Sequence, residues 1–161
     1  MSRQFREWIT LYQDQVWSLA RYLLADATEA EDVAQEAFLR LWQNQAGIDG
    51  DGTRPWLLAV TRNLCLDRLR RKPGLEAIED TPGPENSGPR NTLDQAQLAD
   101  RLRFAIEGLG EPYRSLVVLR DMQQNSYADI GTIMALSPEQ VKVYLHRARR
   151  QLRETLFEVK P

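Results

Sequence analysis

Apolar residues recur at steps of three and four through most of the chain, which is the spacing of one face of an α-helix. This pattern predicts a first helix over about residues 5–23 and a second over 28–42, the second opened by a capping box between Thr28 and Glu31. Three glycines within residues 47–52 predict a loop. A third helix is predicted from about residue 55 to residue 71, where the Lys-Pro-Gly sequence that follows ends it.

The composition changes near Pro73. The next segment is rich in proline, glycine and acidic residues and poor in apolar ones, which is typical of a flexible linker. Beyond it, helical spacing returns over about residues 98–106, a short helix follows Pro112, and another runs from Ser126 to Met134. No segment shows the two-residue period of a β-strand. The sequence therefore predicts an all-α fold: two small helical domains, residues 1–74 and 93–161, joined by a linker over residues 75–92.

The last predicted helix, residues 137–153, combines an apolar face with a basic one. Ser137 and Gln140 form a capping box at its start. At about 100° per residue, the apolar positions share one narrow arc; they are Val141, Leu145, Ala148 and Leu152. Because a short helix and a tight turn precede it, the arrangement is that of a helix-turn-helix, whose second helix enters the DNA major groove.

The residues outside the apolar arc of this helix divide by position. Those in its first turns are predicted to face base edges; they are Glu139, Gln140, Lys142, Val143 and His146. The arginines are predicted to lie nearer to phosphates, where they position the protein without reading sequence; they are Arg147, Arg149, Arg150 and Arg153. The alternative is a solvated amphipathic helix whose arginines serve only solubility.

Two further helix faces carry candidate binding residues. On the third helix, Asn63, Asp67 and Arg70 lie within about 60° of one another, flanked by Arg62 and Arg71. Such an exposed stripe suits a single nucleic-acid strand, or it is a surface stripe with a local Asp–Arg pair. On the second helix, Leu39 stands among polar residues on an acidic face that suits a protein partner, although a single exposed leucine is also ordinary; the polar residues are Asp32, Gln35, Glu36 and Gln43.

Composition narrows the function classes. The formal net charge is −2, but Asp26–Glu36 holds five acidic residues whereas Arg54–Lys72 holds six basic ones, so local patches suit nucleic acid. With one histidine and one cysteine, the chain has no metal-ligand cluster, no internal disulfide and no sign of an enzyme or a cofactor. Neither a signal peptide nor an apolar run of about 20 residues is present, so we expect a soluble intracellular protein without membrane insertion. The four tryptophans are expected to be mostly core anchors.

Three segments, residues 26–42, 54–71 and 141–152, resemble a bacterial sigma factor of the extracytoplasmic-function (ECF) type in order and spacing. The resemblance implies a cytoplasmic protein that binds core RNA polymerase and promoter DNA, with catalysis supplied by the polymerase. Polymerase would be bound by Asp32, Gln35, Glu36 and Leu39. The minus-10 element would be melted, and one base would be flipped into a pocket formed by loop 48–54 and the third helix. The residues that would contact this element are Arg54, Trp56, Arg62, Asn63, Asp67, Arg70 and Arg71. The minus-35 duplex would be read by Gln140, Lys142, Val143, His146, Arg147, Arg149 and Arg150.

The chain departs from the family pattern at a few positions. Val143 stands where a small polar residue is usual, which argues against a base contact there. Asp129 and Gly131 replace a more usual Glu and Ala, which lowers the helix propensity of the first helix of the motif. A stand-alone helix-turn-helix repressor or activator remains the alternative, but it leaves the Asn63 stripe without a role. An anti-sigma partner is left open, as is a compact chain whose basic surfaces face each other across the linker.

Overall fold

The structure is a computed structural model that describes residues 2–71 and 95–157, so the predicted linker at residues 75–92 lies outside the described part. Its main elements are α1 (Arg3–Leu24), α2 (Ala27–Asn44), α3 (Thr53–Arg71), α5 (Gln95–Glu107), α6 (Tyr113–Val117), α7 (Tyr127–Met134) and α8 (Pro138–Phe157). Two 3-10 turns, η1 (Gln45–Gly47) and η2 (Gly50–Gly52), separate α2 from α3, and a π-helical turn, η3 (Val118–Met122), extends α6. Over the described ranges every regular element is helical, which confirms the all-α prediction.

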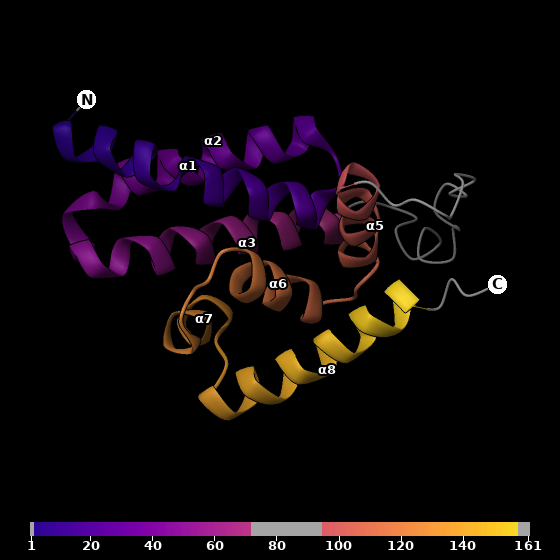
Figure 1. Cartoon of the computed structure of the whole chain (residues 1–161). Coiled ribbons are helices and arrows are strands. Elements are labelled where there is room, and N and C mark those ends of the chain that lie inside the picture. The colour runs from indigo at the N-terminus through magenta and orange to yellow at the C-terminus, as the bar shows by residue number, and fades with distance from the viewer. Residues whose placement is uncertain (1, 72–94, 158–161) are drawn as a thin grey trace.

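Helices α1, α2 and α3 form the first bundle, with their long axes side by side (Figure 1). Each contributes fully buried leucines to the core, among them Leu19, Leu41 and Leu57. Helix α2 begins at Asp26: its Oδ1 accepts hydrogen bonds from the backbone N–H groups of Thr28 (2.9 Å) and Glu29 (3.2 Å). The predicted Thr28–Glu31 capping box is therefore wrong, because Thr28 already lies inside the helix and Asp26 has the extended backbone that an N-cap requires.

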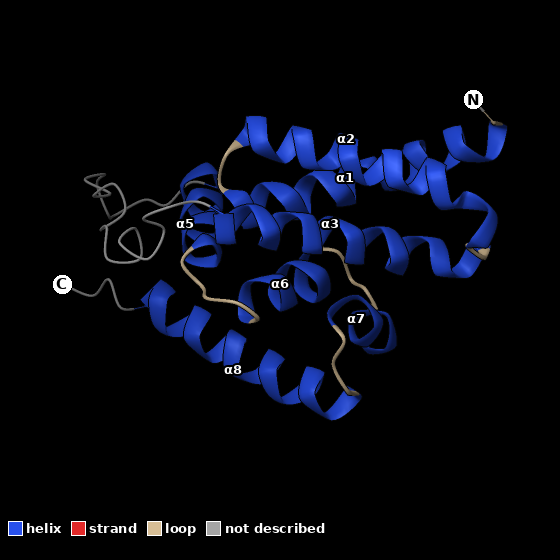
Figure 2. Cartoon of the chain, turned by 180° about the vertical axis from the view of Figure 1, so that it is seen from behind, coloured by secondary structure: helices blue, strands red, loops and turns tan. Residues whose placement is uncertain are grey.

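The second half is built from α5 to α8, with α6 and α7 lying between α3 and α8 (Figure 2). Ser126 caps α7 by accepting from the N–H of Asp129. The predicted capping box of α8 is confirmed: Gln140 N–H donates to Ser137 Oγ (3.1 Å), and Ser137 N–H donates to Gln140 Oε1 (2.9 Å). This double cap fixes the turn between α7 and α8, and with it the direction in which the basic helix leaves the body.

The two halves pack against each other. Helix α7 lies on α3, and one cluster of buried apolar side chains extends from α1–α3 into α6–α8. Hydrogen bonds to the backbone of α1 add to the contact: Arg114 Nη1 donates to the carbonyl of Leu23 (3.2 Å), and Gln123 Nε2 donates to that of Gln15 (3.0 Å). The chain is therefore closed on itself. The exposed stripe of α3 and the basic face of α8 point to solvent instead of facing each other.

Candidate functional site

An apolar groove runs along the surface between α1 and α2. It encloses about 780 Å³, and its lining includes Phe5, Ile9, Trp17, Ala34, Gln35, Phe38, Leu39 and Trp42. Three large side chains in it are strongly exposed: Leu39 (49%), Trp17 (45%) and Trp42 (40%). Trp42 is held by an edge-to-face contact with Phe5, with ring centroids 5.1 Å apart. Such a contiguous apolar surface is typical of a protein-binding site, and we refer to it as the α1–α2 groove.

Only some of the residues predicted to bind a protein line the groove. Gln35 and Leu39 line it. Asp32 and Glu36 instead make ion pairs, with Asp32 Oδ2 3.9 Å from Arg68 Nη1 on α3 and Glu36 Oε1 3.2 Å from Arg40 Nε. The four predicted residues therefore share one side of α2, but only two of them enter the groove.

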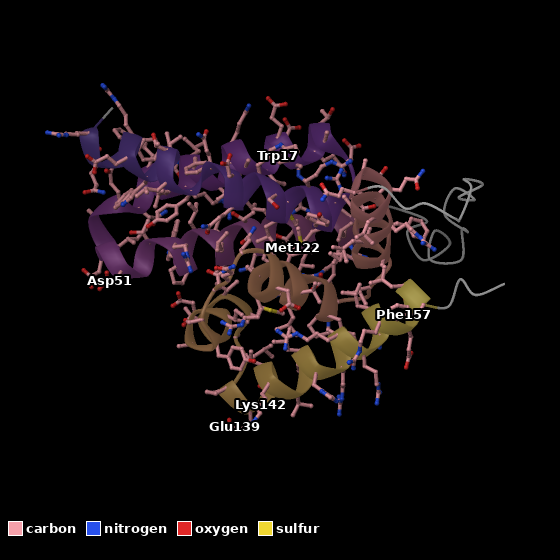
Figure 3. All side chains as sticks on the ribbon, viewed as in Figure 1. Trp17, Asp51, Met122, Glu139, Lys142 and Phe157 are labelled. Atoms are coloured by element: carbon pink, nitrogen blue, oxygen red, sulfur yellow. The ribbon has the colours of Figure 1, made fainter. Side chains whose placement is uncertain are left out.

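Two tryptophans of the groove were not predicted as functional residues. Trp8 is buried, as expected, but the core role expected for Trp17 and Trp42 is wrong, because both open onto the groove. Figure 3 shows Trp17 on the α1–α2 side of the molecule, away from α8. The sequence carried a signal for Trp17, since at about 100° per residue it falls about 130° from the centre of the apolar arc of α1.

The polar stripe of α3 is exposed, as predicted. Asn63, Asp67, Arg70 and Arg71 are all exposed. Arg70 Nη1 lies 3.5 Å from Asp67 Oδ1, so the local pair considered from the sequence is present. An exposed i,i+3 pair is weak, and both groups stay within reach of a ligand. The η2 loop ends beside this helix and carries Asp51 to the edge of the molecule (Figure 3).

Arg62 does not join this stripe. Its guanidinium Nε donates to Ser115 Oγ (2.9 Å) and its Nη2 to Glu111 Oε2 (3.2 Å), and its side chain is only 12% exposed. Both partners come from the second half of the chain. In the same way, Arg54 Nη2 lies 4.0 Å from Asp129 Oδ2 of α7. These two predicted DNA-binding arginines thus hold the halves together in this arrangement.

Trp56 is half-buried, packed against the core cluster of α3. At about 100° per residue it lies on the same face of α3 as the stripe, two turns before Asn63, and its contact with DNA stays a prediction. Its partial burial reflects the cover that α1, α2 and α7 give to α3.

The outward face of α8 is basic. Val141, Leu145 and Ala148 are buried against the body, while the opposite face is exposed. A shallow hollow on that face is lined by Glu139, Lys142, Val143, His146, Arg147 and Arg150, among others. Figure 3 shows Glu139 and Lys142 at the free N-terminal end of the helix, pointing away from the rest of the molecule. The first two turns are therefore accessible to a double helix.

Two of the residues predicted to contact DNA from α8, Gln140 and Arg149, use side-chain atoms in intramolecular hydrogen bonds. Gln140 uses its side-chain oxygen in the capping box. Arg149 Nε donates to Asp121 Oδ2 (3.1 Å), and this hydrogen bond raises the pKa of Arg149. Arg149 thus ties α8 to η3, whereas Arg147 and Arg150 on the neighbouring positions stay exposed.

Other kinds of site find little support in residues 2–71 and 95–157. These ranges contain no group of three or more His, Cys, Asp or Glu side chains placed to hold a metal ion. Burial raises the pKa of the Cys65 thiol to about 12, which leaves it protonated and unreactive near neutral pH. None of the helices seen in these ranges is long and apolar enough to cross a lipid bilayer.

The molecule combines a helix-turn-helix whose basic helix is exposed, a polar stripe on α3 and an apolar groove on the far side. Together these surfaces indicate a DNA-binding protein that also docks on another protein. Comparison with known families agrees. Residues 8–73 match the family model Sigma-70 region 2, and residues 99–152 match Sigma-70, region 4. The ECF RNA polymerase sigma factor SigL of Mycobacterium tuberculosis is 37% identical over 153 residues, covering 89% of this chain and 84% of SigL. The ECF sigma factor SigW of Bacillus subtilis is 29% identical over 168 residues, covering 96% and 90% of the two chains.

The chain therefore belongs to the ECF sigma factors of the sigma-70 family. It is an RNA polymerase-binding factor for promoter-specific initiation of transcription. Two solved structures share its fold, each with a TM-score of 0.75. They are the sigma factor RpoE in complex with the anti-sigma factor NepR from Bartonella quintana (22% identity, covering 99% of this chain and 100% of that one) and CnrH in complex with the cytosolic domain of CnrY (21% identity, 98% and 90%).

Proposed function

We propose that the three surfaces divide the work of initiation. The α1–α2 groove, with Leu39, Gln35, Trp17 and Trp42, docks on core RNA polymerase, with Asp32 and Glu36 beside it. The stripe Asn63, Asp67, Arg70 and Arg71 captures the melted minus-10 strand. The outward face of α8 reads the minus-35 duplex through Lys142, Val143, His146, Arg147 and Arg150. Residues 1–74 thus act as the minus-10 and polymerase domain, and residues 93–161 as the minus-35 domain.

The observation that supports this division most is the position of the groove. Its apolar side chains lie on the α1–α2 side, whereas α8 forms the opposite edge of the molecule (Figure 1). A protein partner in the groove therefore leaves both polar surfaces free for DNA. A stand-alone repressor needs only α8 and gives no reason for keeping two tryptophans and a leucine exposed together.

No bond-making step is assigned to the chain. Strand opening is driven by bases that leave the duplex and are held by the protein, which offsets a few kcal/mol of lost stacking per base. The exposed amide of Asn63 can both donate to and accept from a base edge. Polymerase supplies the chemistry of RNA synthesis, so we assign no enzymatic activity to this chain and place it in the cytoplasm with the polymerase. One solved protein of similar fold is bound to an anti-sigma factor and another to the cytosolic domain of a second protein, so an anti-sigma protein is a further expected partner.

Separation-of-function variants test the polymerase surface first. Leu39→Asp places a charge in the groove and is expected to lower affinity for core polymerase about tenfold or more. Leu11→Asp is the matched control, since Leu11 lies on α1, is 63% exposed and does not line the groove. It should change core affinity less than about twofold. Equal losses for the two variants, measured by fluorescence anisotropy with labelled protein, would exclude the groove as the docking surface.

Variants in the two DNA surfaces give distinct signatures. Asn63→Ala is expected to reduce open-complex formation about tenfold while leaving core affinity unchanged, because a hydrogen bond made only to unstacked DNA is lost. Lys142→Ala is expected to weaken binding to the chosen minus-35 sequence more than to unrelated duplexes. Loss of core binding with Asn63→Ala contradicts its assignment, and a uniform loss with Lys142→Ala makes that lysine a phosphate contact.

A further inference from the structure

Val143 occupies the centre of the DNA-facing side of α8. At about 100° per residue it lies about 170° from the middle of the arc formed by the buried Val141, Leu145 and Ala148. Its side chain is 46% exposed. Among the described residues of α8, the others that line the same outward hollow at exposed positions are all polar: Glu139, Lys142, His146, Arg147, Arg149 and Arg150. An isopropyl group therefore stands alone in the middle of a polar, mostly cationic face.

Within residues 2–71 and 95–157, packing gives no reason for a valine at this position. It makes no contribution to the buried core, and a β-branched residue is a weaker helix former than the alanine, lysine or glutamate that suits an exposed site. It lies in the second turn of α8, the part of a recognition helix that approaches base edges most closely. The cations around it attract the phosphates on both sides and hold the helix in the groove.

In the major groove, the apolar feature of a base pair is the 5-methyl group of thymine. We propose that Val143 selects a thymine in the minus-35 element by packing against that methyl group. The proposal rests on the DNA-reading role of α8 stated above, and it replaces the expectation that an apolar residue here makes no base contact. Lys142 and His146, the polar neighbours, then read hydrogen-bonding groups on adjacent bases.

The test removes one methyl group at a time. Duplexes bound by holoenzyme (the full chain with core polymerase) are selected from a random pool, and each thymine of the resulting minus-35 site is replaced singly by uracil. At the position that Val143 contacts, loss of the methyl group should weaken binding about fourfold, which corresponds to the free energy of burying one carbon atom. Cytosine at that position should be disfavoured, and 5-methylcytosine should recover part of the loss.

Val143→Ala should abolish the difference between thymine and uracil at that position. Lys142→Ala is the control: it should weaken binding to the selected site, whether thymine or uracil stands at that position, and keep the difference between the two. The proposal is overturned if no thymine responds to demethylation, or if Val143→Ala discriminates thymine from uracil as well as the parent protein does. A holoenzyme that binds no duplex sequence-specifically would instead overturn the DNA-reading role of α8 itself.

Discussion

At the scale of single residues, Gly131 shows how one position shapes the helix-turn-helix. A Cβ atom at this residue would lie 2.8 Å from the carbonyl oxygen of Leu136, closer than any side chain tolerates. Leu136 N–H donates to the carbonyl of Gly131 (3.0 Å), and Ala135 between them has a left-handed backbone with φ of 55°. Gly131 lowers the helix propensity of α7, but its lack of a side chain permits the tight turn that positions α8.

Gly131→Ala is expected to lower the free energy of unfolding by about 1–3 kcal/mol, because the added methyl group forces the backbone of the turn to shift. Gly108→Ala is the matched control, since a Cβ there meets its nearest neighbour, the carbonyl of Phe104, at an ordinary 3.5 Å. Urea denaturation of both variants measures the difference. If Gly131→Ala is as stable as Gly108→Ala, the close approach does not restrict the turn.

Cys65 makes a second prediction at this scale. Burial raises its thiol pKa from 9.0 to about 12. The folded-state pKa lies above the unfolded one, so the stability linked to this group is complete below about pH 9 and is lost as the pH rises toward 12. Iodoacetamide should therefore label the native chain at pH 8 far more slowly than the chain in denaturant. Rapid labelling of the native chain would contradict the burial of this thiol. Cys65→Ala should remove the loss of unfolding free energy that this thiol causes between about pH 9 and pH 12.

At the scale of elements, the start of α2 depends on Asp26. Its carboxylate caps two backbone N–H groups and also complements the positive end of the helix. Asp26→Ala is expected to reduce stability by about 1 kcal/mol, whereas Thr28→Ala should change it by a few tenths, about the size of a propensity difference. Thermal unfolding followed by circular dichroism distinguishes them. A larger loss for Thr28→Ala means that the Thr28–Glu31 capping box operates in solution.

The helices themselves were predictable because their signals are local. The spacing of Val141, Leu145 and Ala148, and the caps at Ser126 and Ser137, depend on neighbours within a few residues along the chain. The start of α2 was misplaced because two overlapping caps fit the same sequence, and only the backbone at Asp26 selects one of them.

The use of each helix face was less predictable. Exposure of Leu39 and of the Asn63 stripe followed from periodicity. The partner of Arg62 did not, since Glu111 is 49 residues away and periodicity says nothing about which surface another half of the chain covers. Trp42 is exposed for a related reason: it lines a groove whose walls come from both α1 and α2, and such a groove is a property of two helices together.

At the scale of the whole molecule, the closed arrangement limits what the chain can touch at once. A compact chain of this length has a diameter of about 40 Å. Minus-10 and minus-35 elements are separated by about 25 base pairs, or about 85 Å of duplex. The contact between the halves, including Arg62 with Glu111 and Ser115, must therefore open before one molecule engages both elements.

A cross-link between the halves tests this requirement. Gln15 and Gln123 are joined by a hydrogen bond across the contact and belong to none of the three binding surfaces. A Gln15→Cys, Gln123→Cys variant coupled with a short bis-maleimide should still bind core polymerase through the α1–α2 groove, because that groove stays exposed. Transcription should fall about tenfold or more, since the elements cannot both be reached.

Two controls should keep full transcription activity. One is the same double variant without the linker, and the other is Gln123→Cys capped with a monofunctional maleimide. Cys65 does not interfere, because its buried thiol stays protonated at the coupling pH. Undiminished transcription by the linked protein means that the halves need not separate.

The central claim, that one chain joins polymerase docking to the reading of two promoter elements, is tested most directly by run-off transcription. The full chain is combined with core polymerase on templates that carry a promoter chosen by the holoenzyme, with either element scrambled in turn. We predict a defined transcript that requires the chain, the minus-10 element and the minus-35 element together. A chain that binds duplex DNA through α8 yet neither associates with core polymerase nor directs a transcript would contradict the account.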